Sequence, residues 1–485
     1  MKKKLKVLFV TAESAPYAQV GGLGEVSYAL PQALFNNDVE VRRVMPLYKE
    51  YKGRTRYIKD FPVPTEDGKF ESCIVKTDPD NKEVPSWFIS NHRYFYRDSI
   101  YSQEDDGFRF FFFCRAVVEM LKLSSWKPNV IHLNDWHTAF LALLVKRELP
   151  EIKTVFTIHN ISYDGFIPPS FLDGILSDRE KLSLGWPDWL SFMKAGILYA
   201  DKLTTVSPTY SMEIQQVGSG NQMQPYLQQR QDKITGILNG IDWISYSPKD
   251  DGVQPYSFDN KSWKVNKKKN RSALREELNL PDMDIPLISM ISRLQTEKGI
   301  DLVIKAFQKL NWESFQIIIM GSGNLYYEGL LSSLSSEYPE NVVFLPEYSH
   351  DLARKIYGAS DIYLMPSQYE PCGIGQLYAM RYGAVPVVNP VGGLRDTVVD
   401  AGHTSKDRSM DVVRRKTTGF YLEEWTDKSL VSALERAINT YNTSTWTSYV
   451  NNCMRYNSSW QQRVDDYIFL YRQLMEKPIE KQENQ

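Results

Sequence analysis

Short apolar runs alternate with amphipathic stretches along the whole chain. This alternation is typical of βαβ units, in which each buried parallel strand is followed by a helix that covers the sheet. In the first half, the pattern predicts strands at Leu5–Val10, Val39–Met45, Val130–Leu133, Thr154–Ile158, Leu203–Val206 and Gly236–Leu238. In the second half, it predicts strands at Pro286–Ile291, Gln316–Met320, Val342–Leu345, Ile362–Met365 and Val385–Val388. We therefore expect an α/β protein with two doubly wound domains that face each other across a cleft.

Length and composition suggest where these domains begin and end. The 485 residues exceed what one hydrophobic core usually supports. Residues 246–270 are polar and lack a convincing apolar period, so we expect a linker there between domains at 1–245 and 271–459. The run Lys267–Lys269 within this linker is expected on the solvated surface. The apolar spacing of residues 460–476 is helical, and this helix is expected to pack back on the first domain.

The charge balance argues against several classes of partner. Lys and Arg total 57 against 59 Asp and Glu, which gives no electrostatic reason to expect nucleic acid or an anionic membrane. The run Lys2–Lys4 precedes an apolar stretch too short for a signal peptide or a membrane span, so a cytoplasmic protein is expected. The 4 cysteines and 6 histidines show no paired ligand spacing, so neither a disulfide framework nor a metal site is expected.

The segment Ser292–Gly299 carries an anion-binding pattern. It follows a predicted buried strand and precedes a helical pattern that starts near Asp301. Arg293 offers a planar fork of donors, Lys298 offers a movable point charge, and the helix start adds partial positive charge. Ligands of open α/β sheets bind outside the carboxyl ends of the strands. The segment therefore predicts a diphosphate site, and its alternative is a solvated surface pair.

Two Gly-Gly-Leu sequences occur at predicted strand-to-helix turns, one in each half. Gly21-Gly22 follows the first strand, and Gly392-Gly393-Leu394 follows the last. One such pair is commonly just a tight turn. Two of them predict equivalent ligand-facing loops, because glycine lets a ligand approach the amides of a helix start. The first loop does not match the G-x-G-x-x-G dinucleotide fingerprint, which argues against a dehydrogenase.

Polar side chains also collect at the ends of other predicted strands. In the first half these are Asp135, His159 with Asn160, and Asn239. A lone histidine is more often structural than catalytic, but a strand-end position beside an asparagine favours a functional role for His159. In the second half, Glu370 follows a strand and could accept protons from sugar hydroxyls or lie near a developing oxocarbenium ion. Its alternative role is a charge at a helix N-terminus.

These residues belong to motifs that resemble those of bacterial glycogen synthases and plant starch synthases. The resemblance spans Val7 to Tyr471, in the family's order. The motifs are Gly-Gly-Leu-Gly-Glu, Asp135-Trp136-His137, His159-Asn160, KAGILYADKLTTVSPTY from Lys194, GILNGID from Gly236, SRLQTEKG, MPSQYEPCG and VGGLRDTV. The resemblance implies the GT-B fold, with two Rossmann-like domains. It also implies retaining transfer of glucose from ADP-glucose to the non-reducing 4-hydroxyl of an α-1,4-glucan.

On the donor side, the resemblance implies a role for each matching residue of the second half. Arg293 and Lys298 would neutralise the diphosphate as it leaves. Glu370 would contact the glucose hydroxyls, with the amides of Cys372 and Gly373 close by. Neither a metal nor a cofactor is implied, because basic side chains and helix N-termini stabilise the leaving group in such enzymes.

The resemblance likewise implies roles around the glucose, the adenine and the acceptor. His159 would hold the 6-hydroxyl, and Asn239 would help to fix the glucose. Tyr348 falls where the family stacks an aromatic ring on the adenine. Asp135 and Glu25 would line the donor or acceptor side.

Two departures from the family pattern keep alternatives open. Gln19 stands where the family has a lysine, and losing a charge-assisted contact would cost about 1.5–3 kcal/mol. Residues 218–222 replace a glycine-leucine loop, so the acceptor cleft is expected to differ. One alternative is a catalytically weak paralogue that binds glucan or nucleotide. Another is a related transferase that uses a different donor, such as UDP-glucose, or a different acceptor.

Overall fold

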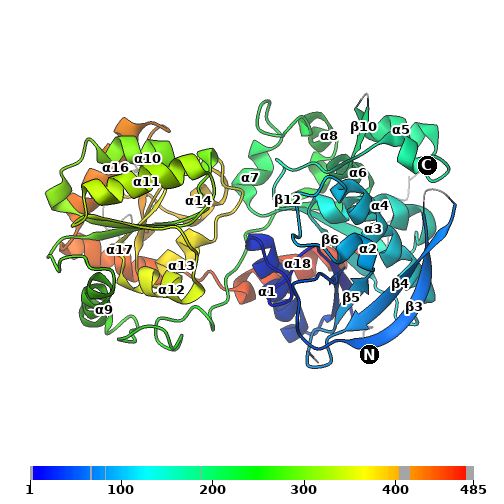
Figure 1. Ribbon diagram of the computed structural model, residues 1–485, viewed down its shortest axis with the longest axis horizontal. Coiled ribbons are helices and arrows are strands. Elements are labelled where there is room, and N and C mark those ends of the chain that lie inside the picture. Colours follow the sequence, from blue (N-terminus) through cyan, green and yellow to red (C-terminus); the bar gives the residue numbers. More distant parts are fainter. Residues whose placement is uncertain (1–3, 66–67, 82, 187, 403–415, 477–485) are drawn as a thin grey trace, which may run out of the picture. The chain divides into compact units, whose positions relative to one another are not determined.

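The protein divides into two compact units, each with its own sheet and helices (Figure 1). The computed structural model describes residues 4–65, 68–81, 83–186, 188–402 and 416–476. Unit 1 comprises residues 1–240 and 460–485, and unit 2 comprises residues 241–459. Lys2 and Lys3 of the basic lead-in lie outside the described residues. Among the helices that the structure describes, none is both long and apolar enough to cross a membrane.

The sheet of unit 1 is built on parallel strands that are buried on both faces. Its order is β12-β11-β7-β6-β1-β2-β5-β4-β3, and only β4 and β3 run antiparallel to their neighbours. Parallel strands need apolar residues on both faces because helices cover both sides. The parallel strands are β1 (Lys6–Val10), β2 (Glu40–Pro46), β5 (Ser86–Ser90), β6 (Val130–Asn134), β7 (Lys153–Ile158), β11 (Lys202–Thr205) and β12 (Ile234–Gly236).

Three strands of this sheet are absent from the sequence prediction. They are β3 (Arg56–Pro64), β4 (Phe70–Thr77) and β5. Pro62 and Pro64 weaken the strand signal of β3, since proline cannot donate to a ladder, but β3 lies at the edge of the sheet, where this is tolerated. The last strand of the first half was predicted at Gly236–Leu238, two residues too late. The strand observed there is β12, which pairs with β11 through Ile234–Gly236.

Helices cover the sheet of unit 1, and the C-terminal helix lies beside the first one (Figure 1). A small separate sheet of β8 (Phe166–Ile167), β9 (Gly185–Trp186) and β10 (Trp189–Ser191) adjoins them. The helices are α1 (Gly22–Asn36), α2 (His92–Phe95), α3 (Asp106–Leu123), α4 (Trp136–Glu148), α5 (Asp178–Leu184), α6 (Phe192–Tyr199), α7 (Pro208–Glu213), α8 (Gln224–Gln228) and α18 (Trp460–Met475).

Unit 2 is a parallel sheet with order β15-β14-β13-β16-β17-β18 and helices around it. The strands are β13 (Leu287–Ile291), β14 (Gln316–Met320), β15 (Val342–Leu345), β16 (Ile362–Met365), β17 (Val385–Val388) and β18 (Phe420–Tyr421). The helices are α9 (Trp263–Glu277), α10 (Ile300–Phe307), α11 (Leu325–Glu337), α12 (His350–Ala359), α13 (Gly375–Arg381), α14 (Gly392–Thr397), α16 (Asp427–Thr440) and α17 (Ser444–Arg455).

The expected linker at 246–270 is part of unit 2. Its last residues form the start of α9. The outer face of this helix is rich in lysine, so its few buried positions give no convincing apolar period in the sequence. The expectation that the whole lysine run is solvated was wrong for Lys267, which is buried. Its ammonium donates to the carbonyls of Tyr357, Gly358 and Tyr382 at 2.9–3.2 Å. These carbonyls lie at the C-terminal ends of α12 and α13, where a cation is favourable.

A buried hydrogen bond joins α18 to the sheet of unit 1. The hydroxyl of Tyr471 lies 2.6 Å from Nδ1 of His132, and Nε2 of His132 lies 2.6 Å from the hydroxyl of Thr157. Burial lowers the pKa of His132 to about 3, so the ring is neutral and both nitrogens need partners.

We expect Tyr471→Phe to lower the free energy of unfolding of unit 1 by about 1–3 kcal/mol, because Nδ1 of His132 would be left buried and unpaired. Urea denaturation followed by tryptophan fluorescence measures this. Tyr96→Phe is a suitable control, since Tyr96 is 49% exposed. Equal stability of Tyr471→Phe and the natural protein would contradict the structural role of the bond.

Candidate active site

In unit 1, the candidate residues gather where the strand order changes direction. Strand β1 lies between β2 and β6 in the sheet. The chain first adds strands on one side of β1 and later on its other side, and this change of direction creates an opening at the carboxyl ends of β1 and β6. Asp135 directly follows β6, and His159 directly follows the next strand, β7. The structure thus brings together Asp135, His159 and Asn160, three residues selected from the sequence.

The backbone conformation of Asp135 and the burial of its carboxyl are both energetically unfavourable. Its backbone has φ 61° and ψ 176°, a region that costs a residue with a side chain about 1–3 kcal/mol. Its carboxyl is buried, and Oδ1 has no hydrogen-bond partner among the described residues. Burial raises the pKa of Asp135 to about 7, although the backbone N–H groups of Asn160 and Trp136 oppose the rise. Backbone strain and a raised carboxyl pKa are both typical of functional positions.

His159 is a neutral imidazole of defined tautomer. Burial lowers its pKa to about 3. The amide Nδ2 of Asn134 donates to the carbonyls of Val10 and His132, so its Oδ1 must accept from Nε2 of His159, 3.0 Å away. The proton therefore sits on Nε2, and Nδ1 is left as an acceptor. A neutral acceptor suits a hydroxyl donor and cannot act as a cation toward phosphate.

Glu13 was not predicted from the sequence, yet it organises the first Gly-Gly loop. Its Oε2 accepts the N–H groups of Val20 at 2.5 Å and Gly21 at 3.1 Å. Burial raises the pKa of Glu13, and these two N–H groups oppose the rise. The only sequence signal was a carboxylate shortly after β1. Gln19 is exposed and packs against Gly24, where an added Cβ would lie 2.8 Å from Cγ of Gln19.

In unit 2, the central observation is an ion pair between neighbouring strand ends. Strand β13 lies between β14 and β16, so the change of direction falls at the carboxyl ends of β13 and β16. Nζ of Lys298, after β13, lies 2.6 Å from Oε2 of Glu370, after β16. The hydroxyl of Ser367 donates to the same oxygen at 3.0 Å. The guanidinium of Arg293 is on the exposed part of the same loop and makes no hydrogen bond or ion pair with any described residue.

The second Gly-Gly loop packs directly against the backbone of Glu370 and Cys372. An added Cβ on Gly392 would lie 2.0 Å from the carbonyl oxygen of Glu370, and one on Gly393 would lie 2.0 Å from that of Cys372. Gly393 also donates its N–H to the carbonyl of Glu370 at 3.2 Å. By contrast, an added Cβ on Gly21 would meet nothing within 4 Å. The two loops therefore differ in packing at their glycines, and that both face a ligand stays a prediction.

The remaining predicted residues differ in how far their side chains are exposed. The side chains of Leu394 and Cys372 are buried, so only their backbones could face a ligand. Asn239 is buried too, and its Oδ1 lacks a partner within the described part of the chain. Tyr348 is 52% exposed, and its ring lies edge-on to that of His350.

Three further predicted residues lie on the loops already described. Gly22 and Glu25 are in the first turn of α1. Gly373 has φ 70°, which favours glycine, in the turn before α13. The carbonyl of Gly373 accepts from Nε2 of Gln376 at 3.0 Å. The roles of Gly22, Glu25 and Gly373 toward a ligand stay predictions.

The loop Gly321-Ser322-Gly323 was missed by the sequence analysis. It follows β14 and packs on the Arg293 loop, where Leu294 donates its N–H to the carbonyl of Ser322 at 2.9 Å. An added Cβ on Gly321 would lie 1.8 Å from the carbonyl oxygen of Ser292. The signal was present in the sequence as a Gly-Ser-Gly run after a predicted strand. This loop therefore positions the predicted anion-binding segment from the side of β14.

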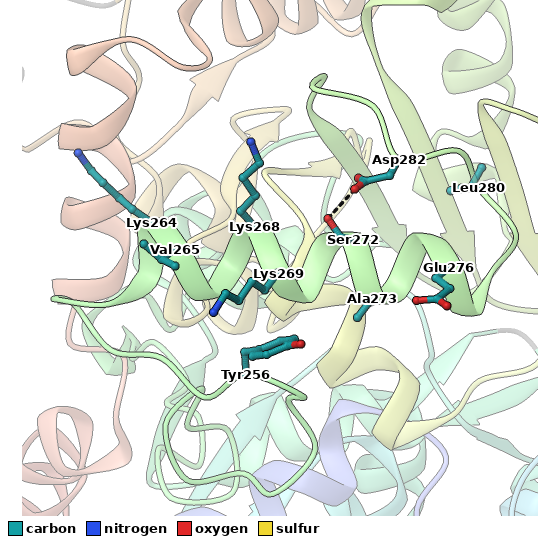
Figure 2. Close-up of a pocket in the computed structure, with 10 residues that line it drawn as sticks. All are labelled: Tyr256, Lys264, Val265, Lys268, Lys269, Ser272, Ala273, Glu276, Leu280 and Asp282. Atoms are coloured by element: carbon teal, nitrogen blue, oxygen red, sulfur yellow. Dashed lines mark hydrogen bonds between the residues drawn. The ribbon is translucent and has the colours of Figure 1, made fainter.

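A hollow of about 830 Å³ runs beside α9 in unit 2, away from these residues (Figure 2). Nζ of Lys269 lies 5.2 Å from the ring centroid of Tyr256, whereas Lys264 and Lys268 point away from that ring (Figure 2). Because the three ammonium groups diverge, the hollow offers no convergent anion site. Throughout the described ranges, no group of three or more His, Cys, Asp or Glu side chains is arranged to hold a metal ion.

Comparison with known proteins decides the family. The family model described as "Starch synthase catalytic domain" matches residues 6–229, and "Glycosyl transferases group 1" matches residues 270–445. The chain is 37% identical to a glycogen synthase of Desulforudis audaxviator, over 99% of this chain and 98% of that one. It is 36% identical to a glycogen synthase of Moorella thermoacetica, over 98% of each chain. The chain belongs to the glycogen and starch synthase family.

Solved structures agree with this family assignment. The chain is similar to the catalytic domain of starch synthase IV from Arabidopsis thaliana, bound to ADP and acarbose, with a TM-score of 0.88 and 30% identity over 97% of this chain and 99% of that one. A sucrose-phosphate synthase from Thermosynechococcus elongatus shares the fold, with a TM-score of 0.64 at 16% identity. The sequence predictions of the family, of the GT-B fold and of a glycosyltransferase are confirmed.

For this family member, we expect the stability advantage of Asp135→Asn over the natural protein to grow as pH rises. The raised pKa of Asp135 makes the natural protein lose stability from about pH 4, near the carboxyl's unfolded pKa, to about pH 7, and the amide cannot titrate. The variant should therefore be more stable by about 1–3 kcal/mol above pH 7, with the difference shrinking toward pH 4.

Urea denaturation between pH 5 and pH 8.5 provides the measurement for Asp135→Asn. Glu13 titrates in both proteins, so its own contribution largely cancels in the difference. A stability difference that does not change with pH would show that the Asp135 carboxyl is not held neutral in the folded protein.

Proposed function

We propose that this chain transfers glucose from ADP-glucose to the non-reducing 4-hydroxyl of an α-1,4-glucan, with retention at the anomeric carbon. The relatives named glycogen synthase and the starch synthase IV structure bound to ADP and acarbose support this proposal. The observation that carries it is the pairing of Lys298 with Glu370 at the change of strand direction in unit 2, with Arg293 exposed on the same loop as Lys298 and unpaired among the described residues.

In this proposal, unit 2 binds the donor. Arg293 and Lys298 neutralise the diphosphate as negative charge develops on it, a preorganised form of electrostatic stabilisation. The ion pair with Glu370 holds Lys298 in place before the donor arrives, and Glu370 keeps one oxygen, Oε1, for glucose hydroxyls. The amides of Cys372 and Gly373 lie close to the same sugar, and Tyr348 offers its exposed ring to the adenine.

Unit 1 supplies hydrogen-bond acceptors in this proposal. Nδ1 of His159 accepts a hydrogen bond from the 6-hydroxyl of glucose, because Nε2 is already engaged with Asn134. Asp135 and Asn239 each keep a buried oxygen without a described partner, so each can accept from a sugar hydroxyl. Such unpaired acceptors are costly until a ligand satisfies them, which gives the site its preference for a polyhydroxyl substrate.

We expect Arg293→Ala and Lys298→Ala each to lower kcat/KM for ADP-glucose by about a hundredfold or more, since each removes one cation from the departing diphosphate. Initial rates of glucose transfer to glycogen measure this. Lys305→Ala, an exposed lysine of α10, is the matched control and should retain full activity. Undiminished transfer by both variants would refute the donor site.

Gln19 favours one second candidate function, that of a catalytically weak glucan-binding protein. Under our proposal, the natural protein transfers glucose, and Gln19→Lys raises kcat/KM by about tenfold or more through a restored charge-assisted contact. Gln19→Met, which adds no charge, should show no such gain. Absence of transfer by the natural protein, with transfer by Gln19→Lys, would instead support the weak paralogue. A parallel assay with UDP-glucose tests the choice of donor.

A further inference from the structure

The turn Glu370–Gly373 precedes α13 and packs on the start of α14, and both helices are labelled in Figure 1. The backbone N–H of Gly393, in the first turn of α14, donates to the carbonyl of Glu370 at 3.2 Å and to the carbonyl of Pro371 at 3.1 Å. The first two carbonyl groups of the turn therefore point toward α14.

The side chain of Gln376, in the first turn of α13, continues this pattern. Its Nε2 donates to the carbonyl of Cys372 at 3.2 Å and to the carbonyl of Gly373 at 3.0 Å, and the side chain is fully buried. Because carbonyl oxygens only accept hydrogen bonds, the nitrogen of the amide and not its oxygen must face them. Two donors, one from each helix, thus engage all four carbonyl groups of the turn.

The hydroxyl of Thr397 fixes the orientation of the Gln376 amide. It accepts from Nε2 of Gln376 at 3.1 Å and donates to the carbonyl of Gly393 at 2.6 Å. Thr397 is buried on α14, so this link is shielded from water. Oε1 of Gln376 lies only 2.5 Å from the position of a Cβ added on Gly373, so a side chain there would displace the amide.

The direction of the carbonyl groups decides where the N–H groups of the turn point. In a trans peptide, each N–H points away from the carbonyl of the residue before it. The carbonyls of residues 371–373 face the two donors, so the N–H groups of residues 372–374 face the opposite side. Those of Gly373 and Ile374 have no acceptor among the residues described. Successive N–H groups around a residue of positive φ, such as Gly373 at 70°, form a concave site for anions.

We propose that Gln376, fixed by Thr397, is a positioning residue for the nucleotide-sugar donor, because it turns the N–H groups of Gly373 and Ile374 toward the diphosphate. This inference rests on the proposed function, which places the donor beside Lys298. Without the Nε2 donor, the peptide planes on either side of Gly373 are free to rotate, since glycine tolerates most backbone conformations. Carbonyl oxygens would then face the phosphate, where they repel the charge that the N–H groups stabilise.

The test uses the full-length protein with Gln376→Met, which keeps the length of the side chain and removes its donor. We expect kcat/KM for ADP-glucose to fall about tenfold or more and the Kd of ADP, measured by calorimetry, to rise about tenfold. The KM for glycogen should stay unchanged, because the glucan does not contact this turn. Gln308→Met, at the exposed end of α10, is the matched control and should behave like the natural protein. Thermal unfolding checks that both variants fold.

Thr397→Val and Thr397→Ser provide a second test that leaves Gln376 in place. Valine removes the hydroxyl that fixes the amide, whereas serine keeps it. We expect Thr397→Val to lower kcat/KM for ADP-glucose about threefold to tenfold, and Thr397→Ser to retain most of the activity. Thr440→Val is the matched control, because Thr440 also donates to a carbonyl four residues earlier, at 2.6 Å, but at the end of α16. Equal activity of the valine and serine variants would overturn the role of the hydroxyl.

Binding of ADP separates this inference from the proposed function, because it needs no turnover. If the natural protein binds ADP but transfers no glucose, the proposed function falls, and weaker ADP binding by Gln376→Met still supports the positioning role. If the natural protein transfers glucose and both Gln376→Met and Thr397→Val match its kcat/KM and its Kd for ADP, the positioning role falls and the proposed function stands.

Discussion

The parallel pairing of strands joined by crossovers determines where most candidate residues of this protein lie. Because each strand–helix–strand unit returns the chain in the same direction, the carboxyl ends of the parallel strands meet at one edge of each sheet. An opening forms where consecutive crossovers leave a strand on opposite sides. This point falls between β1 and β6 in unit 1 and between β13 and β16 in unit 2. Asp135 stands at the first, and Lys298 and Glu370 stand at the second.

The two units use opposite electrostatics at equivalent positions of the fold. In unit 1, burial keeps His159 neutral and raises the pKa of Asp135 to about 7, so the negative charge of this carboxyl is reduced near neutral pH. In unit 2, Lys298 is paired with the carboxylate of Glu370 and Arg293 is exposed, so the site presents two basic side chains. Neutral acceptors suit sugar hydroxyls and cations suit phosphate oxygens. This difference in charge supports the assignment of the glucan to unit 1 and of the diphosphate to unit 2.

Glycine also has different physical functions in the two units. In unit 1, Gly21 faces open space, and the carboxylate of Glu13 fixes the loop by accepting two backbone N–H groups. In unit 2, Gly392 and Gly393 allow backbone to pack directly on the carbonyls of Glu370 and Cys372. The same tripeptide therefore leaves room for a ligand in one unit and supports an acidic side chain in the other. A motif shared by two loops does not show that the loops do the same work.

The sequence by itself determined most of the parallel strands, the fold class, the family and the order of the motifs, but not β3, β4 and β5. These follow from local periodicity and from residues next to a strand end, such as His159 or Glu370, which need no knowledge of distant contacts. Tertiary structure alone decided which polar groups are buried and what they contact. Lys267 appeared solvated until α12 and α13 placed their carbonyls around it, and Glu13 had no visible role until the loop at Val20 turned back onto it. The buried oxygen of Asp135, which has no partner among the described residues, likewise depends on segments far apart in the chain. Desolvation and hydrogen-bond pairing are set by all the atoms around a group, and no single stretch of sequence contains them.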